Sequence, residues 1–236
     1  ERRDCFTASQ LDALNYIIDN QLTLVWGPPG TGKTHFLALA VLTLLEAAAR
    51  AGRPMRILVT AFTHAAIENC LRKIDSLRED LGMDQDDAPL VKLGPVYTQG
   101  CEGIDCIDRD GAIGFIGRNE RCLVGGTVNK MQGQECEVVI VSYGLADPEC
   151  AMIEGEFIYS LNRFNVAVTR AKSKCTVFVP RPLLKPCLSV LENPETAMGA
   201  GMMHKLEVHT AAGQALDFTV KCDMYPEGTR LAVYRQ

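Results

Sequence analysis

The sequence predicts an α/β fold in which a parallel β-sheet is flanked by helices and followed by a small tail that contains β-structure. Three observations predict it. Short apolar segments rich in Val, Leu and Ile alternate along the chain with longer segments of helical periodicity. A glycine-proline loop joins the first such strand to the first long helix. The 236 residues, 47% hydrophobic and 22% charged, are enough for one domain and a fraction.

Each element is indicated by its own local pattern. A capping-box pattern from Thr7 to Gln10 opens the first helix, and Thr63 is placed to cap a later one. The expected helices span residues 7–20, 33–50, 63–74, 164–172 and 183–192. The expected strands span residues 22–26, 56–60, 90–94, 122–124, 138–141 and 175–179. Segment 95–120 is glycine-rich and predicts a loop or a poorly ordered insert, and residues 225–228 predict a turn between two strands of the tail.

Composition excludes several classes of protein. The formal charge of −5 and the pI near 5.4 exclude a uniformly basic surface for nucleic acid, but they allow a local basic patch. Six basic and no acidic residues between 157 and 191 predict either such a patch or a solvated face. The longest apolar run, at 36–49, is too short to span a membrane.

Cysteine usage and the first residue bear on the cellular context. The ten cysteines are scattered without a C-x2-C pair, and the four histidines do not cluster near them. This spacing argues against a zinc site and against a disulfide framework, and it predicts reduced thiols in an intracellular protein. The chain starts at Glu1 rather than at methionine, which predicts that it is a piece of a longer protein.

Residues 27–34 form the strongest functional motif. The run Gly27-Pro28-Pro29-Gly30-Thr31-Gly32-Lys33-Thr34 matches G-x-x-x-x-G-K-[ST] and lies between a predicted strand and a predicted helix. Glycines let successive backbone N–H groups face phosphate oxygens, and the helix start adds its partial positive charge. Lys33 is expected to reach the β- and γ-phosphates, and the Thr34 hydroxyl is expected to coordinate Mg²⁺. The motif therefore predicts binding of a nucleoside triphosphate.

The flanks of this loop carry a resemblance to a known family. The segment from Trp26 to Thr34, with Gln10 upstream, resembles the ATP site of superfamily 1B helicases of the senataxin and nonsense-mediated-decay type. The resemblance implies a RecA-like fold of P-loop NTPases, ATP as the nucleotide, and a role for Gln10 in reading the adenine. The capping box remains a second interpretation of Gln10.

Residues 59–69 resemble the family's motif Ia, a strand-to-helix corner that grips the nucleic-acid backbone. The resemblance implies that Thr63 and His64 bind DNA or RNA, and a hydroxyl at a helix start is a suitable phosphate donor. The senataxin type has Pro-Ser-Asn where this chain has Phe62, Thr63 and His64, so the match is partial. A plain N-cap is the alternative role of Thr63.

Two further segments resemble motifs of the second helicase domain. Residues 127–135 are similar to motif V, which faces nucleotide and nucleic acid across the interdomain cleft, and this implies that Glu135 contacts the nucleotide. Residues 161–172 match motif VI, whose arginine neutralises the γ-phosphate in the transition state, and this implies a catalytic role for Arg170. The alternatives are a polar turn before a strand and a solvated arginine on a helix.

The middle of the family's pattern is missing. The family's Asp-Glu pair, its Gly-Asp-x-x-Gln motif and the arginine of motif IV are all absent, and one Thr-Val pair at 127–128 serves both the front segment and motif V. This predicts that the front of one RecA-like domain, 1–126, is joined to the back of another, 127–184, and is followed by an extension, 185–236. In such a composite sheet, the strand at 138–141 takes the place of the Asp-Glu strand.

Three functions remain open from the sequence. In the predicted composite sheet Ser142 and Tyr143 stand where the carboxylates belong, and tyrosine is a poor base at neutral pH. The first function is a helicase-like ATPase on single-stranded DNA or RNA, without autonomous unwinding, because translocation needs two moving domains. The second is a nucleotide-binding pseudoenzyme or assembly module. The third is a truncated product with a marginal fold.

Overall fold

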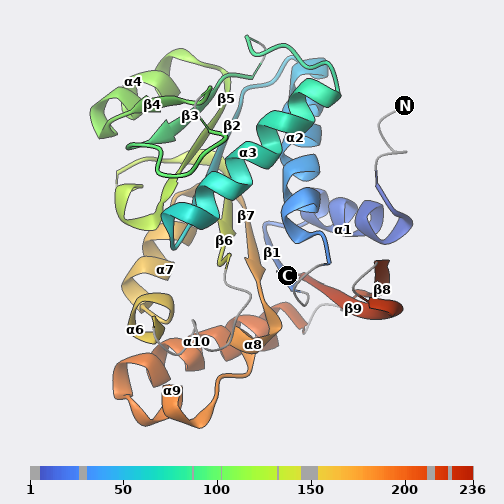
Figure 1. The fold of residues 1–236 in the computed structure, drawn as a ribbon, viewed down its shortest axis with the longest axis vertical. Helices are drawn as coiled ribbons and strands as arrows, with labels where there is room; N and C mark the ends of the chain where they lie inside the picture. Colours follow the sequence, from blue (N-terminus) through green and yellow to red (C-terminus); the bar gives the residue numbers. More distant parts are fainter. Residues whose placement is uncertain are drawn as a thin grey trace.

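A computed structural model describes residues 6–26, 31–86, 88–101, 103–131, 133–144, 154–211, 216–222 and 225–235, with side chains described up to residue 210. Its centre is a nine-stranded sheet in the order β4-β3-β5-β2-β6-β7-β1-β9-β8 (Figure 1). The seven strands from β4 to β1 are parallel, and β9 and β8 continue the sheet in antiparallel pairing. The predicted α/β class, with a parallel sheet and a β-containing tail, is confirmed.

The elements follow one another as strand and helix along most of the chain. The strands are β1 (Leu22–Trp26), β2 (Met55–Ala61), β3 (Leu90–Leu93), β4 (Asp105–Ile107), β5 (Arg121–Thr127), β6 (Cys136–Ser142), β7 (Ala171–Val179), β8 (Leu216–Cys222) and β9 (Tyr225–Arg235). The helices are α1 (Ala8–Asp19), α2 (Lys33–Arg50), α3 (His64–Asp80), α4 (Arg109–Arg118), the 3-10 turn η2 (Val128–Lys130), α6 (Gly155–Ile158), α7 (Leu161–Val168), α8 (Arg181–Leu184), α9 (Leu188–Glu192) and α10 (Pro194–Ala211).

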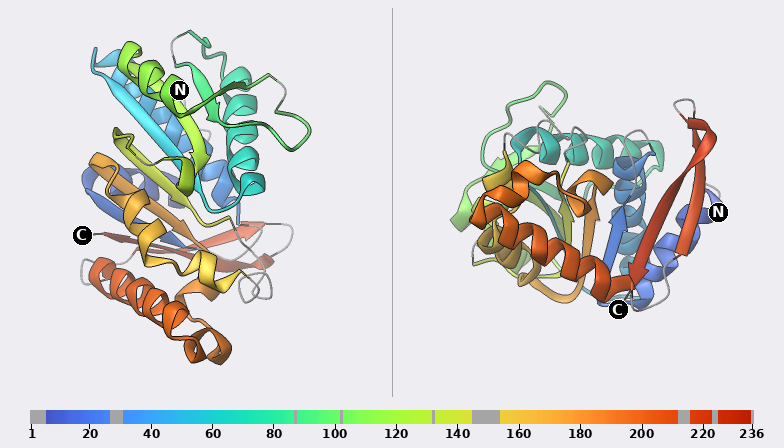
Figure 2. Two further views of the ribbon diagram at one scale, coloured as in Figure 1. Left: turned by 90° about the vertical axis from the view of Figure 1, so that its left-hand side faces the viewer. Right: turned by 90° about the horizontal axis from the view of Figure 1, so that it is seen from below.

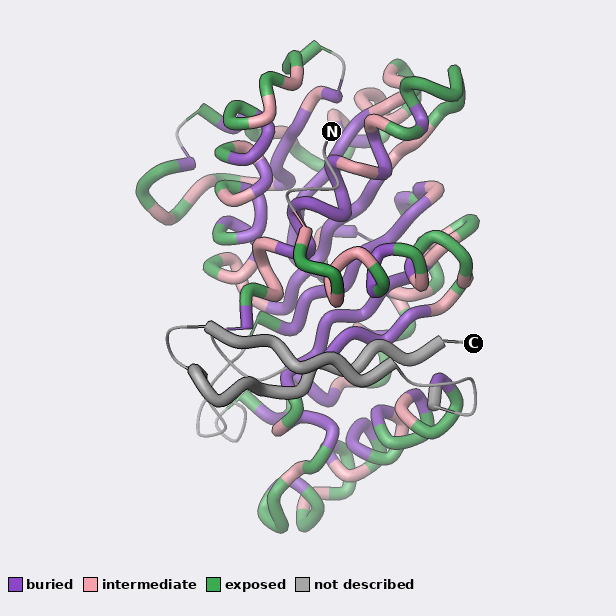
Figure 3. Tube along the Cα trace, turned by 90° about the vertical axis from the view of Figure 1, so that its right-hand side faces the viewer, coloured by how far each residue is buried: buried purple, intermediate pink, exposed green. Residues whose placement is uncertain are grey.

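Helices cover both faces of the sheet, and a separate hydrophobic core lies between the sheet and the helices on each face (Figure 2). α1, α2 and α3 pack on one face, where they meet strand residues such as Val25 and Ile140. α4, α7 and α10 contribute to the core on the other face, which contains Leu24 and Val139. Neighbouring strand residues enter opposite cores because side chains alternate along a strand. Figure 3 shows the central strands buried between these layers.

The segments on the two sides of the predicted junction at 126/127 lie in one sheet. β2, from the front segment, pairs in parallel with both β5 and β6. β7 lies between β6 and β1, with Trp26 opposite Val179 and Ser142 opposite Phe178. β6 is therefore one strand removed from the strand that precedes the phosphate loop, and the carboxyl ends of both strands lie at the same edge. The exact limits predicted for the three parts of the chain remain a prediction.

Local capping explains where the first helices begin. Thr7 Oγ1 accepts a hydrogen bond from the Gln10 N–H at 3.3 Å, and Gln10 Oε1 accepts one from the Thr7 N–H at 3.1 Å, so the predicted capping box is present. Thr63 Oγ1 accepts from the Ala66 N–H at 3.2 Å at the start of α3. Each bond satisfies a backbone donor that the first helical turn leaves without an intrahelical acceptor.

Segment 95–120 is not the loop that its glycines predicted. It contains β4, which pairs with β3, and the ten-residue helix α4. Asp108 caps α4, because its Oδ1 accepts the Gly111 N–H at 2.7 Å, and Ala112 packs this helix against the sheet. The cap compensates for the low helix propensity of the glycines.

The C-terminal extension also differs from its prediction. The predicted helix at 183–192 is divided into α8 and α9, and the long helix α10 follows it without having been predicted. A Cβ atom at Gly199 would lie 1.8 Å from the Tyr159 carbonyl oxygen, so only glycine allows α10 to pass this close to the end of α6. Residues 225–228, predicted as a turn, lie inside β9.

Two general findings limit the classes of site. Among the residues that the structure describes, no helix is both long enough and apolar enough to cross a lipid bilayer. The same residues contain no group of three or more His, Cys, Asp or Glu side chains arranged to hold a metal ion.

Candidate functional site

The parallel strands bring the segments after β1, β2, β3, β5, β6 and β7 to one edge of the sheet, which we call the carboxyl edge; the opposite edge is the amino edge (Figure 1). In open parallel sheets ligands bind outside the carboxyl ends of the strands. The residues predicted to form a single nucleotide site fall at both edges. Their distribution determines which of them can act together within one chain.

The phosphate-loop motif lies at the carboxyl edge, between β1 and α2. Gly32 is the N-cap of α2 with a φ of 74°, a left-handed conformation that favours glycine, and no side chain caps this helix start. Thr31 is buried beside it, and Lys33 and Thr34 open the helix. The remaining predicted residues of the motif, Gly27, Pro28, Pro29 and Gly30, lie outside the described residues.

The electrostatics of Lys33 suit an anionic ligand. Burial lowers the pKa of the Lys33 ammonium to about 8, because a charged group loses solvation there. The N–H groups at the start of α2 carry partial positive charge, and the half-buried Thr34 supplies a hydroxyl. This donor set of ammonium, backbone N–H and hydroxyl fits a triphosphate and the Mg²⁺ that it carries.

Gln10 lies on the first turn of α1, close to the start of α2. The Phe6 ring meets the Phe36 ring edge-on at a centroid distance of 6.3 Å, and this contact ties the two helix starts together. The Gln10 side chain is engaged in the capping box with Thr7. The other role predicted for Gln10 is to read the adenine. That role requires its side chain to break the hydrogen bond with Thr7.

Thr63 and His64 lie at the carboxyl end of β2, as motif Ia predicts. Thr63 acts as the N-cap of α3, the alternative role predicted for it. The His64 ring meets the Tyr97 ring at 4.6 Å, and the buried His64 Nδ1 has no hydrogen-bond partner among the described residues. Burial and the nearby cations of Lys92 and Lys130 lower the pKa of His64, so the imidazole is neutral at pH 7.

A buried ion pair behind His64 was not predicted. Glu68 of α3 and Lys92 of β3 are both fully buried, and Glu68 Oε1 lies 3.1 Å from Lys92 Nζ. Burial opposes ionisation of Glu68, but hydrogen bonds from Thr98, Tyr97 and Lys92 outweigh it and hold the pKa of the carboxyl below its usual value. Both residues occupy positions where the hydrophobic pattern expects apolar side chains, and this mismatch was the available sequence signal.

Among the described residues, the two that directly follow or end β6 at its carboxyl end, Ser142 and Tyr143, carry no carboxylate. Ser142 and Tyr143 stand there as predicted, but Tyr143 is fully buried and stacks on Phe62 at a centroid distance of 4.3 Å. Burial raises the pKa of its phenol well above the ordinary value, so it cannot act as a base. Ser142 hydrogen-bonds the Cys70 thiol, whose pKa burial raises to about 11. Neither side chain replaces the Asp-Glu pair in chemistry.

Glu135 and Arg170 lie at the amino edge, away from the phosphate loop. Glu135 directly precedes β6, and the backbone carbonyl of Arg170 accepts the Cys136 N–H at 3.0 Å. Arg170 lies between α7 and β7, and its guanidinium turns back onto α7 and donates from Nε to the Val166 carbonyl at 3.2 Å. β7 separates this end from the phosphate-loop edge by nine residues at roughly 3.3 Å each, or about 30 Å. The fold does not bring these two residues to Lys33 of the same chain.

The six basic residues between 157 and 191 do not form one patch. Arg170, Lys172 and Lys174 lie at the amino-edge end of β7, whereas Arg181 follows its carboxyl end. The Arg181 guanidinium lies over the Trp26 ring, 4.9 Å from its centroid, and Trp26 is the last residue before the phosphate loop. The family resemblance implied that Arg170 lies at the nucleotide, but the direction of β7 places Arg181 on that side instead.

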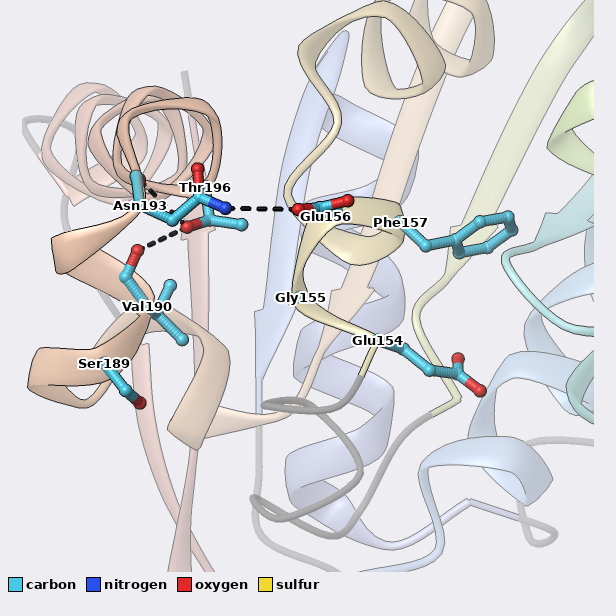
Figure 4. Close-up of a pocket in the computed structure, with 8 residues that line it drawn as sticks. All are labelled: Glu154, Gly155, Glu156, Phe157, Ser189, Val190, Asn193 and Thr196. Carbon is cyan, nitrogen blue, oxygen red and sulfur yellow. Dashed lines mark hydrogen bonds between the residues drawn. The ribbon is translucent and has the colours of Figure 1, made fainter.

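A separate cavity of about 420 Å³ lies between α6 and the α9–α10 corner (Figure 4). Glu154, Glu156 and Ser189 are among the residues that line it, and Asn193 Nδ2 donates to Glu156 Oε1 at 3.2 Å. The two carboxylates give this cavity an acidic wall. It is therefore not suited to the phosphates of a nucleotide.

Two regions of the chain match family models of known proteins. Residues 6–99 match a family model described as an AAA domain, and residues 113–181 match a second model with the same description. The second match includes β5, which the sequence analysis assigned to the front part of the chain. The NFX1-type zinc finger-containing protein 1 homolog of Caenorhabditis elegans is 34% identical over 77 residues, which are 31% of this chain and 3% of that protein.

Two solved structures show lower similarity. The C-terminal domain of a possible DNA helicase from Lactobacillus plantarum has a TM-score of 0.36 and 13% identity, over 74% of this chain and 85% of that one. The O-methyltransferase TomG from Streptomyces achromogenes has a TM-score of 0.33 and 11% identity, over 82% and 78%. Similarity at this level carries no functional argument. The two matched AAA domains, at 6–99 and 113–181, are of the kind typical of superfamily 1 helicases.

Proposed function

We propose that this chain binds ATP with Mg²⁺ at the carboxyl edge through residues 27–34, and that it binds a single strand of DNA or RNA at the same edge around Thr63 and His64. The observation that carries the proposal is the start of α2. A glycine N-cap without a side-chain cap, a partly desolvated Lys33 and the Thr34 hydroxyl are together in one place. The family supports it, because AAA domains typically bind ATP and Mg²⁺.

Each residue has a separate role in this proposal. Lys33 pairs with phosphate oxygens and regains the stabilisation that burial removed from its charge. The backbone N–H groups at the start of α2 hold the phosphates, and Thr34 takes one coordination position of the metal. Gln10 leaves its capping box to contact the adenine. Bound Mg²⁺ supplies the positive charge that phosphoryl transfer requires.

The carboxyl end of β6 favours a second candidate, binding without rapid turnover. Tyr143 is stacked in the core and Ser142 bonds a thiol, so neither positions a water molecule. ATP would then act as a structural or regulatory ligand. Glu135 and Arg170 would contact only a nucleotide held by a second domain or a second copy, because they lie at the other edge.

We also infer an intracellular location from the cysteines. Cys122 and Cys136 are thiols in the core, and burial raises the pKa of each to about 12, so they are inert packing groups. They need no oxidising compartment.

The test is ATP binding and turnover of the wild type and of Lys33→Met. Isothermal titration with Mg-ATP should give binding that Lys33→Met weakens by at least tenfold, because an ammonium–phosphate contact is lost. Lys172→Met, which removes an exposed lysine at the amino edge, is the matched control and should bind as the wild type does. Phosphate release with and without single-stranded DNA or RNA then separates the two candidates.

The outcomes are distinct. Turnover that a strand stimulates and that Lys33→Met abolishes supports the coupled ATPase. Binding without phosphate release supports the second candidate. Equal affinity of Lys33→Met and the wild type would contradict the whole nucleotide proposal.

A further inference from the structure

The carboxyl edge carries an aromatic and basic strip beyond the residues of motif Ia. It runs over Tyr97 and His64, then Lys130 and Asn129 of η2, and ends at Arg163 of α7; we call these five residues the edge strip. His64 contacts Tyr97 and lies within electrostatic range of Lys130. Asn129 is the chain neighbour of Lys130 and accepts a hydrogen bond from Arg163. The residues come from the segments after β2, β3 and β5 and from a helix that packs beside them.

Tyr97 is the exposed end of this strip. Its side chain is 63% exposed, which is unusual for a large aromatic residue at a position so firmly held. The Tyr97 N–H donates to Glu68 Oε1 at 2.9 Å, and the Thr98 N–H donates to Glu68 Oε2 at 2.7 Å. Arg72 Nη1 donates to the Gln99 carbonyl at 3.1 Å. The loop is thereby fastened to α3 at Tyr97 itself and at the two residues that follow it.

The underside of the Tyr97 ring is supported. His64 meets it edge-on at a centroid distance of 4.6 Å, and the buried Lys92 ammonium lies 5.4 Å from the ring centroid. The ring is thus fixed in position before any ligand arrives. A fixed ring loses little conformational entropy when a flat partner stacks on it, and this favours binding.

Cationic groups continue the strip. A Cβ atom at Gly94 would lie 1.9 Å from Lys130 Nζ, so the missing side chain of Gly94 makes room for this ammonium. The guanidinium carbon of Arg163 lies 3.6 Å from the centroid of the Phe157 ring, and Arg163 Nε donates to Asn129 Oδ1 at 3.1 Å. Asn129 and Arg163 also line an open cavity of about 340 Å³. These side chains offer donors to anionic or polar groups beside an aromatic platform.

We propose that the edge strip binds an unpaired nucleic-acid strand, with one base stacked on Tyr97 and with phosphates facing Lys130 and Arg163. This rests on the proposed function and names a residue and a binding mode that motif Ia does not include. Stacking requires a base that is free of its complement, so the strip selects single strands over duplexes. The same chemistry recognises DNA and RNA, because both present a flat base and a phosphate.

Fluorescence anisotropy with labelled oligonucleotides tests this. The probes are a 20-nucleotide oligodeoxythymidine, an oligouridine of equal length and an abasic deoxyribose strand of equal length. Tyr97→Ala should weaken binding of both base-containing strands by about 5- to 100-fold, the usual effect of removing one stacking platform, and should leave the abasic strand unaffected. Tyr97→Phe keeps the ring and should bind within about twofold of the wild type.

Two further variants complete the experiment, one as a control and one as a test of the phosphate contact. Leu188→Ala removes an exposed apolar side chain on α9, 78% exposed, and should change no affinity. Lys130→Ala should weaken all three strands alike and reduce the salt slope of log Kd by about 0.7, the value for one phosphate contact on a single strand. The thermal unfolding of each variant is recorded, so that a loss of fold is not taken for a loss of stacking.

The failures of the two proposals differ. If the wild type binds no strand, the nucleic-acid part of the proposed function fails, and the inference fails with it. If the wild type binds but Tyr97→Ala matches it, or loses the abasic strand equally, stacking on Tyr97 is wrong while the proposed function stands. A difference between the thymidine and uridine strands shows that the 2′-hydroxyl of the sugar or the 5-methyl group of the base affects binding.

Discussion

The two edges of the sheet differ in what their residues can do together. The carboxyl edge joins Lys33, Thr63 and Tyr97, with buried charges fastening the loops from behind. The amino edge holds Glu135 and Arg170, which resemble nucleotide-contacting residues of two-domain helicases but face no phosphate loop here. Residues that match the helicase motifs therefore lie at both edges, whereas the residues proposed to bind nucleotide and nucleic acid lie together at one. Strand direction, not the motif itself, decides which residues share a ligand.

The largest expected effect is on the free energy of unfolding, to which the ion pairs of the two edges contribute differently. Lys92→Met leaves the Glu68 carboxylate buried without its cation, and we expect a loss of roughly 3–5 kcal/mol in the free energy of unfolding. Arg56 and Glu137, 3.2 Å apart near the amino edge, are both about one-fifth exposed, so Arg56→Met should cost only about 1–2 kcal/mol. Urea unfolding of both variants measures the difference. Equal losses would show that the loop at the carboxyl edge is not held by its buried pair.

The pH dependence of ATP binding sharpens the comparison next. The pKa of Lys33 is about 8 in the ligand-free protein, and phosphate binding favours the charged form. Above pH 8 binding must also protonate Lys33, so the Kd for Mg-ATP should rise by up to about tenfold per pH unit. Lys33→Arg stays charged and should show a flat profile in the same titration. A wild-type Kd that is constant from pH 7 to 9.5 would contradict the role of Lys33.

The same shift has a consequence for stability with the opposite direction. The folded-state pKa of Lys33 lies below the ordinary lysine value of 10.5, so the unfolded chain binds more protons between pH 8 and 10.5. The contribution of Lys33 to the stability of the free protein therefore rises with pH across this window. Binding weakens there while this contribution grows.

The two arginines give the smallest expected effect. Arg181 shares the carboxyl edge with the phosphate loop, so Arg181→Met should raise the Kd for Mg-ATP about fivefold, the effect of one exposed charge of about 1 kcal/mol. Arg170→Met should leave the Kd unchanged, because its guanidinium lies at the amino edge. Trp26 is the chain's only tryptophan, and its fluorescence reports both the contact with Arg181 and the titration. The reverse ranking would show that the nucleotide binds at the amino edge.

Sequence patterns predicted the order of strands and helices and the caps at Thr7 and Thr63, because these depend on short-range periodicity and hydrogen bonding. The composite sheet was predicted from the family resemblance and its missing middle motifs, not from local patterns. α10 was missed, since its glycines and methionines show no clear apolar stripe and its position depends on the contact of Gly199 with Tyr159. The pairing of Glu68 with Lys92 was also missed. The mismatch of each charge with the hydrophobic pattern around it is a local signal of burial, but no local signal shows that these two residues, far apart in sequence, pair with each other.

The division of the predicted nucleotide site had a different cause. Spacing along the chain identified Glu135 and Arg170 by resemblance, but the resemblance belongs to proteins in which two domains face each other. In this chain Glu135 and Arg170 directly precede β6 and β7. Both strands run parallel to β1, so these two residues lie at the amino edge, opposite Lys33. Only the three-dimensional arrangement shows that Arg181, eleven residues further along, lies beside Trp26 instead.

Photolabelling with 8-azido-ATP tests most directly which edge holds the nucleotide. The chain is irradiated with the reagent and Mg²⁺, digested, and the labelled peptide is identified by mass spectrometry, with excess ATP as the competitor. We predict that competed label appears within residues 6–36, around Gln10 and the phosphate loop. Competed label at residues 133–137 or 168–174 instead would place the nucleotide at the amino edge and would contradict the account.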